Sequence, residues 1–146
     1  KSTGSVKLKS SNPNDELNIN PNWFIDPSDM EDMIEGMKHT REVLSKPSLA
    51  KIVSEELLPG KKIKSDQDLK DSVRNHVQTG HHPASTCAMG SSNNKMAVLD
   101  SQLKVRGIDN LRVVDASSFP DMISGNINAS VIMLAEKASD MILKIN

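Results

Sequence analysis

Apolar and polar side chains alternate in two short stretches near the start of the chain. Val6 and Leu8 are separated and flanked by polar residues, and Leu17 and Ile19 repeat this pattern eleven residues later. A period of two residues is typical of a β-strand with one apolar face. Turn-forming residues fill positions 10–15. The pattern therefore predicts two short strands joined by a turn.

A helical period of about 3.6 residues replaces this alternation after the aromatic pair Trp23–Phe24, which we expect to anchor the first helix. Serine residues placed before apolar runs act as helix caps, and proline or glycine ends a helix. We predict three helices: one from a capping box of Ser28 and Glu31 to the break enforced by Pro47, one over Leu49–Leu58, and one from Ser65 to Gly80.

Short extended runs and turns follow Gly80. The strand candidates in this region are Val98–Leu99, Leu103–Val105 and Leu111–Val114. The period becomes helical again after Gly125, and one apolar face should bury the last helix. That face consists of Val131, Leu134, Ala135, Ala138, Met141 and Ile142.

Composition excludes some function classes. The 146 residues fit one ordinary domain, with 18 Lys and Arg against 19 Asp and Glu and no basic stripe, so nucleic acid is not an expected partner. No run is long and apolar enough for a transmembrane segment. The single cysteine, Cys87, cannot form an internal disulfide and says nothing about the compartment. Eight methionines and no tyrosine indicate a core filled by aliphatic side chains and methionine.

Adjacent histidines, His81 and His82, follow the third predicted helix. A zinc site needs three or four ligands at workable spacing, and Cys87 with these two residues does not form a known pattern. A pair of surface histidines is the plain alternative. We expect extended backbone to send the two side chains to opposite faces. The sequence predicts no metal site.

Three further polar residues lie where an apolar run ends or a helix begins. Asp115 follows the run 111–114, where a carboxylate either caps a turn or binds a sugar hydroxyl. Asn126 and Asn128 precede the last helix, where an asparagine is most simply an N-cap. Spacing alone leaves these alternatives open.

Taken in order, five segments resemble the carboxy-terminal segment of glucose-methanol-choline oxidoreductases. Each is weak alone, but their order and spacing match together. The amino-terminal half, with Gly4–Leu8, Asp15–Asn22 and the helix at Ser28, is also similar to that family, so the resemblance covers nearly the whole chain. The segments are His82–Gly90, Val98–Asp100, Leu103–Gly107, Asn110–Ser117 and Ser124–Ala129.

The resemblance implies an α+β fold, in which an antiparallel sheet backed by helices forms a substrate domain and a C-terminal helix completes an FAD-binding domain. Residues 1–105 would be mostly substrate domain, and 106–146 would return to the flavin side. FAD is the implied cofactor of the full-length protein. No Gly-x-Gly-x-x-Gly loop occurs in this chain. We therefore expect the N-terminal FAD-binding part of the same polypeptide as a partner, and no FAD bound to this fragment alone.

Roles for single residues also follow from the resemblance. His82 matches the family's catalytic base, and Asn126 matches the partner position that holds the substrate oxygen. Asp115, Ala116 and Asn128 match the cofactor-binding region, with the amino terminus of the last helix pointing at the flavin ring.

The implied activity is hydride transfer from an alcohol CH–OH group to flavin. Two alternatives to alcohol oxidation are a hydroxynitrile lyase on the same scaffold and, for the isolated chain, an inert interaction domain. The low aromatic count argues mildly against choline as the alcohol, and the compartment is not predicted.

Overall fold

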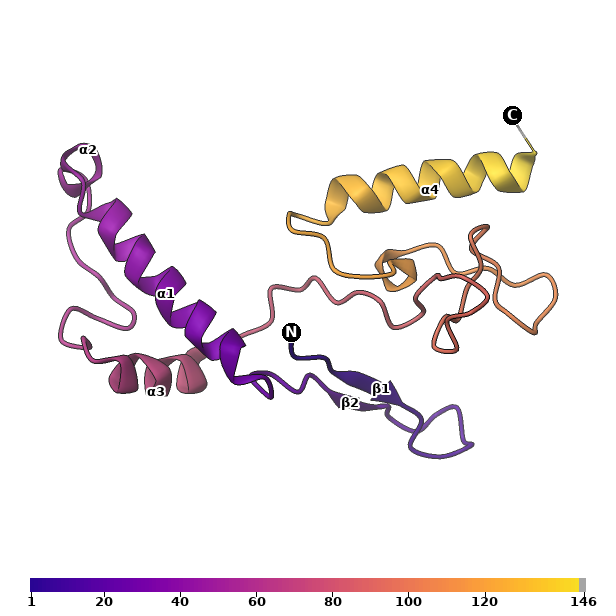
Figure 1. Cartoon of the computed structure of the whole chain (residues 1–146), viewed down its shortest axis with the longest axis horizontal. Coiled ribbons are helices and arrows are strands. Elements are labelled where there is room, and N and C mark those ends of the chain that lie inside the picture. The colour runs from indigo at the N-terminus through magenta and orange to yellow at the C-terminus, as the bar shows by residue number, and fades with distance from the viewer. Residues whose placement is uncertain (145–146) are drawn as a thin grey trace. The chain divides into compact units, whose positions relative to one another are not determined.

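The computed structural model describes residues 1–144, which divide into two compact units, Lys1–Gln78 and the residues from Thr79 onward. The first unit contains a β-hairpin and three helices, and the second contains the last helix on a base of loops (Figure 1). Helices with a small antiparallel sheet confirm the α+β class at that level. The larger sheet, the helix completing an FAD-binding domain and the domain boundary near residue 105 stay predictions.

The hairpin pairs β1 (Ser5–Lys7) with β2 (Asn18–Asn20) in antiparallel register, as the alternating pattern predicts. Its turn is held by Asp15, whose carboxylate accepts hydrogen bonds from Ser10 Oγ at 2.7 Å and Asn12 Nδ2 at 3.1 Å. At Gly4 the strands come so close that an added Cβ would lie 2.5 Å from the carbonyl oxygen of Asn20. Glycine is therefore required at the entry to β1.

Helix α1 (Pro27–Leu44) begins two residues earlier than an N-cap at Ser28 would place it. Its N-cap is Asp26, whose Oδ1 accepts from the backbone nitrogen of Ser28 at 2.9 Å. Pro27 occupies the first helical position, where its missing N–H costs nothing. The Ser28–Glu31 capping box is therefore wrong, whereas the break before Pro47 is confirmed.

The second predicted helix is mostly absent. Helix α2 covers only Pro47–Ala50, and the residues from Lys51 to Leu58 are not helical. Leu57 and Leu58 are 78% and 67% exposed, so the apolar pattern has no surface to pack against here. Helix α3 (Asp66–His76) starts at the predicted cap, with Ser65 accepting from the backbone nitrogen of Asp68, but it ends before Gly80.

The core of the first unit lies between α1 and α3. Its buried residues are Met30, Ile34, Leu69 and Val73. Phe24 packs against this cluster, as expected of the aromatic pair, but Trp23 remains 49% exposed. Only one of the two aromatic side chains therefore anchors α1.

The second unit consists of turns, the short 3-10 helix η1 (Ala116–Ser118) and helix α4 (Asn128–Leu143). The predicted strands appear, in the part of the chain that is described, only as isolated bridges such as Leu99 with Val105 and Lys104 with Arg112. Leu103 and Asn110 have left-handed backbone conformations, which interrupt the extended runs.

Helix α4 starts where the sequence predicts, but only part of its predicted apolar face is covered. Leu134 and Ala138 are buried and pack with Leu99, Leu103 and Phe119, whereas Ala135 and Ile142 are exposed.

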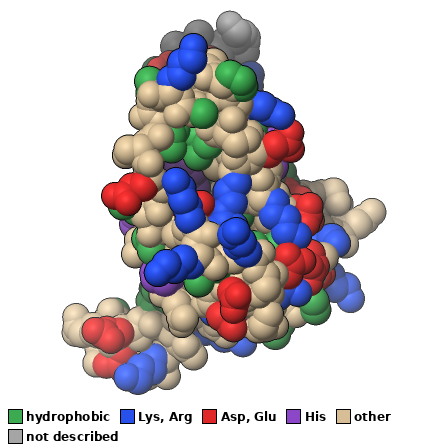
Figure 2. All heavy atoms as spheres, turned by 90° about the vertical axis from the view of Figure 1, so that its left-hand side faces the viewer, with side chains coloured by type: hydrophobic (Ala, Val, Ile, Leu, Met, Phe, Trp, Pro, Cys, Tyr) green, Lys and Arg blue, Asp and Glu red, His purple; other side chains and the backbone are tan. Residues whose placement is uncertain are grey.

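No helix within residues 1–144 is long and apolar enough to cross a membrane. Figure 2 shows Lys and Arg side chains on one face with Asp and Glu side chains around them.

Candidate functional site

The segment that carries His82 runs alongside η1. The backbone nitrogens of Ser85, Cys87 and Met89 donate hydrogen bonds to the carbonyl oxygens of residues 116, 117 and 118, at 3.2, 2.9 and 3.0 Å. This ladder fixes the backbone three residues after His82. The His82 residue itself is exposed.

His81 differs from His82 in backbone conformation. Its φ of 58° lies in the left-handed region, and its backbone nitrogen donates to Thr79 Oγ1 at 3.0 Å. The expectation that extended backbone sends the two side chains to opposite faces is therefore wrong, because His81 is not extended.

Asp115 caps η1. Its Oδ1 accepts a hydrogen bond from the backbone nitrogen of Ser117 at 2.8 Å, and the hydroxyl of Ser117 donates to the same oxygen. The turn-capping alternative thus describes what Asp115 does within the described chain. The residue is nevertheless exposed, so its carboxylate remains accessible to a further donor such as a sugar hydroxyl.

Asn126 stands just before α4. Its Oδ1 accepts from the backbone nitrogen of Asn128, the first residue of the helix, at 3.0 Å. Because the partner is an N–H group, the oxygen of the amide must face the helix. The two N–H bonds of the amide nitrogen therefore point elsewhere and can donate to a substrate oxygen. The helix N-cap itself is Ile127, so neither asparagine holds the cap position that the sequence suggests.

Three anchors in one core hold the candidate residues. Each candidate has a close neighbour in sequence that packs against the cluster around Leu99, Leu103 and Phe119. These neighbours are Ala84 for His82, Ala116 for Asp115 and Ile127 for Asn126. The two catalytic candidates and the cofactor candidate thus emerge, within one or two residues, from a single packed core. Residues far apart in sequence are in this way held by the same support.

Ser118 is a supporting residue that the sequence analysis did not identify. It is fully buried, and its hydroxyl donates to the carbonyl oxygen of Val113 at 2.9 Å. The η1 turn that carries the ladder to the His82 segment is tied to the preceding extended run by this bond. Nothing in the pair Ser117–Ser118 indicates from sequence which hydroxyl is buried.

A second supporting turn lies at Asp100. Its Oδ1 accepts from the backbone nitrogens of Gln102 at 2.8 Å and Lys104 at 3.0 Å. These bonds, that to Lys104 foremost, lower the pKa of the Asp100 carboxyl. The turn places Leu103, 1% exposed, into the core beneath the site.

The start of α4 fits a negatively charged group, as a reduced flavin would be. Its first turn, Asn128 to Val131, carries no acidic side chain that would neutralise the positive end of the helix dipole. Asn128 and Ala129 are exposed there. For metals the described residues offer no comparable fit, since no group of three His, Cys, Asp or Glu side chains is arranged to bind an ion.

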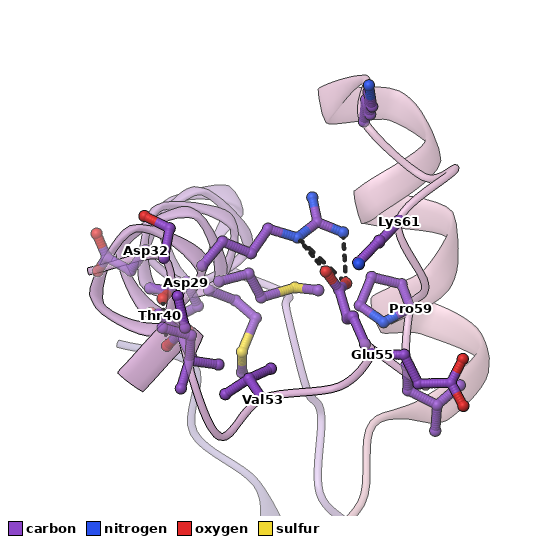
Figure 3. A pocket seen from close by; sticks show the side chains of 17 residues that line it. Asp29, Asp32, Thr40, Val53, Glu55, Pro59 and Lys61 are labelled. Carbon is purple, nitrogen blue, oxygen red and sulfur yellow. Dashed lines mark hydrogen bonds and ion pairs between the residues drawn. The ribbon is translucent and has the colours of Figure 1, made fainter. Parts of the chain in front are cut away.

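A cavity of about 1300 Å³ lies elsewhere, in the first unit beside α1 (Figure 3). Arg41 crosses it to form a bidentate ion pair with Glu56, with Nη2 2.7 Å from Oε1 and Nε 3.1 Å from Oε2. This guanidinium lowers the pKa of the Glu56 carboxyl. None of the predicted site residues lines this cavity.

Comparisons with known proteins agree with the sequence resemblance. Residues 1–135 match the family model described as GMC oxidoreductase. The chain is 45% identical over 141 residues to human mitochondrial choline dehydrogenase, covering 97% of this chain and 24% of that protein. It is 42% identical over 144 residues to an alcohol dehydrogenase [acceptor] of Pseudomonas putida, covering 99% of this chain and 26% of that protein.

Solved structures give the same answer. A formate oxidase of Aspergillus oryzae matches with a TM-score of 0.87 and 34% identity over 97% of this chain and 25% of its own. Pyridoxine 4-oxidase from Mesorbium loti matches with a TM-score of 0.85 and 33% identity, over 98% of this chain and 28% of its own. The chain thus spans about a quarter of the length of the relatives it matches.

Proposed function

Because the chain belongs to the GMC oxidoreductase family, whose members use FAD, we propose that it is the carboxy-terminal part of an enzyme that oxidises the CH–OH group of an alcohol. In this proposal FAD accepts the hydride that leaves the alcohol carbon. The residues of this chain bind the alcohol, hold its oxygen and remove its hydroxyl proton.

His82 is the proposed base. A neutral imidazole accepts a proton on a ring nitrogen near neutral pH, and loss of the hydroxyl proton makes departure of a hydride from the carbon easier. The exposed ring supports this role, and the ladder from residues 85–89 to η1 supports a fixed backbone beneath it. His81 takes no part in proton removal in this proposal.

Asn126 is proposed to hold the substrate oxygen. Its Oδ1 is occupied by the backbone nitrogen of Asn128, so the amide nitrogen presents only donors to the alcohol. A donor stabilises the negative charge that grows on the oxygen as the proton leaves. An amide also does not titrate, so its contribution is the same at every pH at which the enzyme folds.

Asp115, Ala116 and Asn128 are proposed to contact the cofactor. The Asp115 carboxylate would accept a hydrogen bond from a sugar or ribityl hydroxyl while it continues to cap η1. The positive end of α4, beginning at Asn128, would favour negative charge on the adjacent ring system. The dinucleotide-binding loop is assigned to the N-terminal part of the same polypeptide.

One observation carries the proposal: the segments bearing His82, Asp115 and Asn126 are anchored in a single core through Ala84, Ala116 and Ile127. General acid–base catalysis needs groups held within a few tenths of an ångström by packed neighbours. Scattered surface residues of an inert interaction domain have no need of a common support.

The test is anaerobic mixing of the full-length protein with a panel of small alcohols. Oxidation predicts loss of the absorbance of oxidised flavin and formation of one aldehyde or ketone per flavin reduced. Cleavage of a hydroxynitrile without any change in the flavin spectrum would instead make the protein a lyase. An unchanged spectrum with every alcohol, in a protein that contains FAD, would refute alcohol oxidation.

A further inference from the structure

Ser118 is buried although its side chain is polar. Its exposed fraction is 0%, and among residues 1–144 no other polar or charged residue is buried. The next residue, Phe119, is 6% exposed and belongs to the apolar core that supports the candidate site. A buried hydroxyl costs free energy unless it is hydrogen-bonded, whereas a small apolar side chain at the same place has no such cost. Packing alone therefore does not require a serine at this position.

The hydrogen bonds of Ser118 hold the backbone on both sides of Asp115. Its Oγ donates to the carbonyl oxygen of Val113 at 2.9 Å and accepts a longer bond from the backbone nitrogen of Asp115 at 3.5 Å. The backbone nitrogen of Ser118 donates to the carbonyl oxygen of Asp115 at 3.0 Å. Together these three bonds fix the direction in which the chain leaves its extended run at Asp115.

The carboxylate of Asp115 is oriented from this fixed backbone. Its Oδ1 accepts from the backbone nitrogen of Ser117 at 2.8 Å and from the hydroxyl of Ser117. A carboxylate has about four acceptor sites on its two oxygens, and Asp115 is exposed. It can therefore accept a further hydrogen bond from a cofactor hydroxyl without giving up the bonds that orient it.

Ser118 also joins Asp115 to the segment that carries His82. The carbonyl oxygen of Ser118 accepts from the backbone nitrogen of Met89 at 3.0 Å, in the ladder that begins at residue 85. One buried residue thus contacts both the backbone of the proposed cofactor residue and the segment of the proposed base.

We propose that Ser118 is a positioning residue for FAD, which holds Asp115 where its carboxylate meets a cofactor hydroxyl. This proposal rests on the proposed cofactor contact of Asp115. Because Ser118 is fully buried, it acts through Asp115 and does not touch the cofactor itself. Hydrogen bonds weaken steeply with distance and angle, so a small shift of the Asp115 backbone is enough to lose the contact.

The experiment is a double-mutant cycle in the full-length holoenzyme, with Ser118→Ala, Asp115→Ala and the two combined. The readout is the rate of FAD release, followed by flavin fluorescence after dilution at a temperature at which every variant is folded. Val73→Ala is the control for a loss of stability, because Val73 is 7% exposed in the core between α1 and α3 and contacts neither residue. Ser118→Thr tests rescue, because it keeps the hydroxyl.

We expect Ser118→Ala to speed FAD release about tenfold, as for the loss of one hydrogen bond to a charged group. In the Asp115→Ala background the same substitution should add less than about twofold, because the contact through which Ser118 acts is already gone. Ser118→Thr should release FAD more slowly than Ser118→Ala. If Ser118→Ala does not fold, Ser118→Cys, which is similar in size and a weaker donor, should still release FAD faster than the wild type.

Val73→Ala should lower the thermal midpoint and leave the rate of FAD release within about twofold of the wild type. Additive effects of the Ser118 and Asp115 substitutions would overturn the proposal, and so would equal FAD release in Ser118→Ala and Val73→Ala. FAD release does not depend on alcohol oxidation. A protein that oxidises no alcohol can therefore still confirm the positioning role, and an active enzyme with additive effects would refute that role alone.

Discussion

The side-chain oxygen of Asn126 accepts a hydrogen bond from the backbone nitrogen of Asn128 at 3.0 Å, which gives the amide a single orientation. Asn126→Asp keeps an oxygen for this bond but removes the donating nitrogen and adds a negative charge. We expect anaerobic flavin reduction in the full-length enzyme to slow by about 10²-fold or more in this variant, as for the loss of one donor to a developing oxyanion.

Asn126→Ala should slow the same step, with FAD content per protein nearly unchanged. The two variants separate the roles of the side chain, because alanine also removes the bond to Asn128 and aspartate does not. Normal reduction in the aspartate variant would show that the donor does not act on the substrate. Loss of FAD from both would make Asn126 structural.

Asp115→Ala should lower FAD retention before it affects the rate of flavin reduction. The proposed partner of the carboxylate is a cofactor hydroxyl, so the flavin-to-protein absorbance ratio after gel filtration is the measurement. Ser117→Ala is the matched control, because it removes the hydroxyl that donates to Asp115 and leaves the carboxylate in place. Equal FAD content in the Asp115 variant and the wild type would contradict a cofactor contact and leave turn capping as the role of this residue.

The ion pair between Arg41 and Glu56 should stabilise the first unit in a pH-dependent manner. Arg41 holds the pKa of the Glu56 carboxyl below its usual value, so the pair contributes above the pKa of an unfolded glutamate, about 4.3, and its contribution is lost as the pH falls through the lower folded pKa. Arg41→Gln should therefore cost roughly 0.5–1 kcal/mol at pH 7 and less at pH 3.

Urea denaturation of the 146-residue chain measures this difference. Arg74→Gln serves as the control, because the pair that Arg74 forms with Asp71 has both side chains more than half exposed and should contribute close to nothing. A cost for Arg41→Gln that stays the same from pH 7 to pH 3 would contradict the assignment.

The start of α3 depends on local chemistry and was predictable, whereas elements that depend on distant packing were not. Ser65 caps α3 because a serine oxygen can reach the nitrogen of Asp68 without help from the rest of the fold. The 49–58 helix fails because its leucines find no surface, and a short helix without one is unstable in water. At α1 either Asp26 or Ser28 could cap the helix. Asp26 is the N-cap because Pro27 is well suited to the first helical position.

The candidate site shows the same division. The order of the motifs identified His82, Asp115 and Asn126 as candidates, and the structure shows which contacts hold the segments that carry them. Capping by Asp115 follows from its place after an apolar run, but the buried bond from Ser118 to Val113 depends on tertiary packing that spacing does not reveal. The left-handed conformation of His81 is likewise not evident from the sequence, because histidine adopts it more often than most residues but still uncommonly.

The isolated chain should neither retain FAD nor oxidise alcohols. It has no Gly-x-Gly-x-x-Gly loop and represents about a quarter of the length of its relatives, so it supplies only part of a cofactor surface. The purified 146-residue chain, incubated with FAD and passed through gel filtration, is expected to be colourless. A stoichiometric flavin spectrum in the protein peak would place the dinucleotide site within this chain.

The central assignment is His82 as the base, and the neighbouring histidine supplies its control. His82→Ala and His81→Ala in the full-length enzyme remove the same group from adjacent positions. The measurement is the anaerobic rate of flavin reduction by a saturating alcohol, with folding and FAD content checked in each variant.

We predict that His82→Ala lowers the rate about 10²–10⁴-fold, the usual contribution of a positioned general base. His81→Ala should change the rate far less. Equal losses in the two variants, or normal flavin reduction in His82→Ala, would contradict the assignment of His82 as the base.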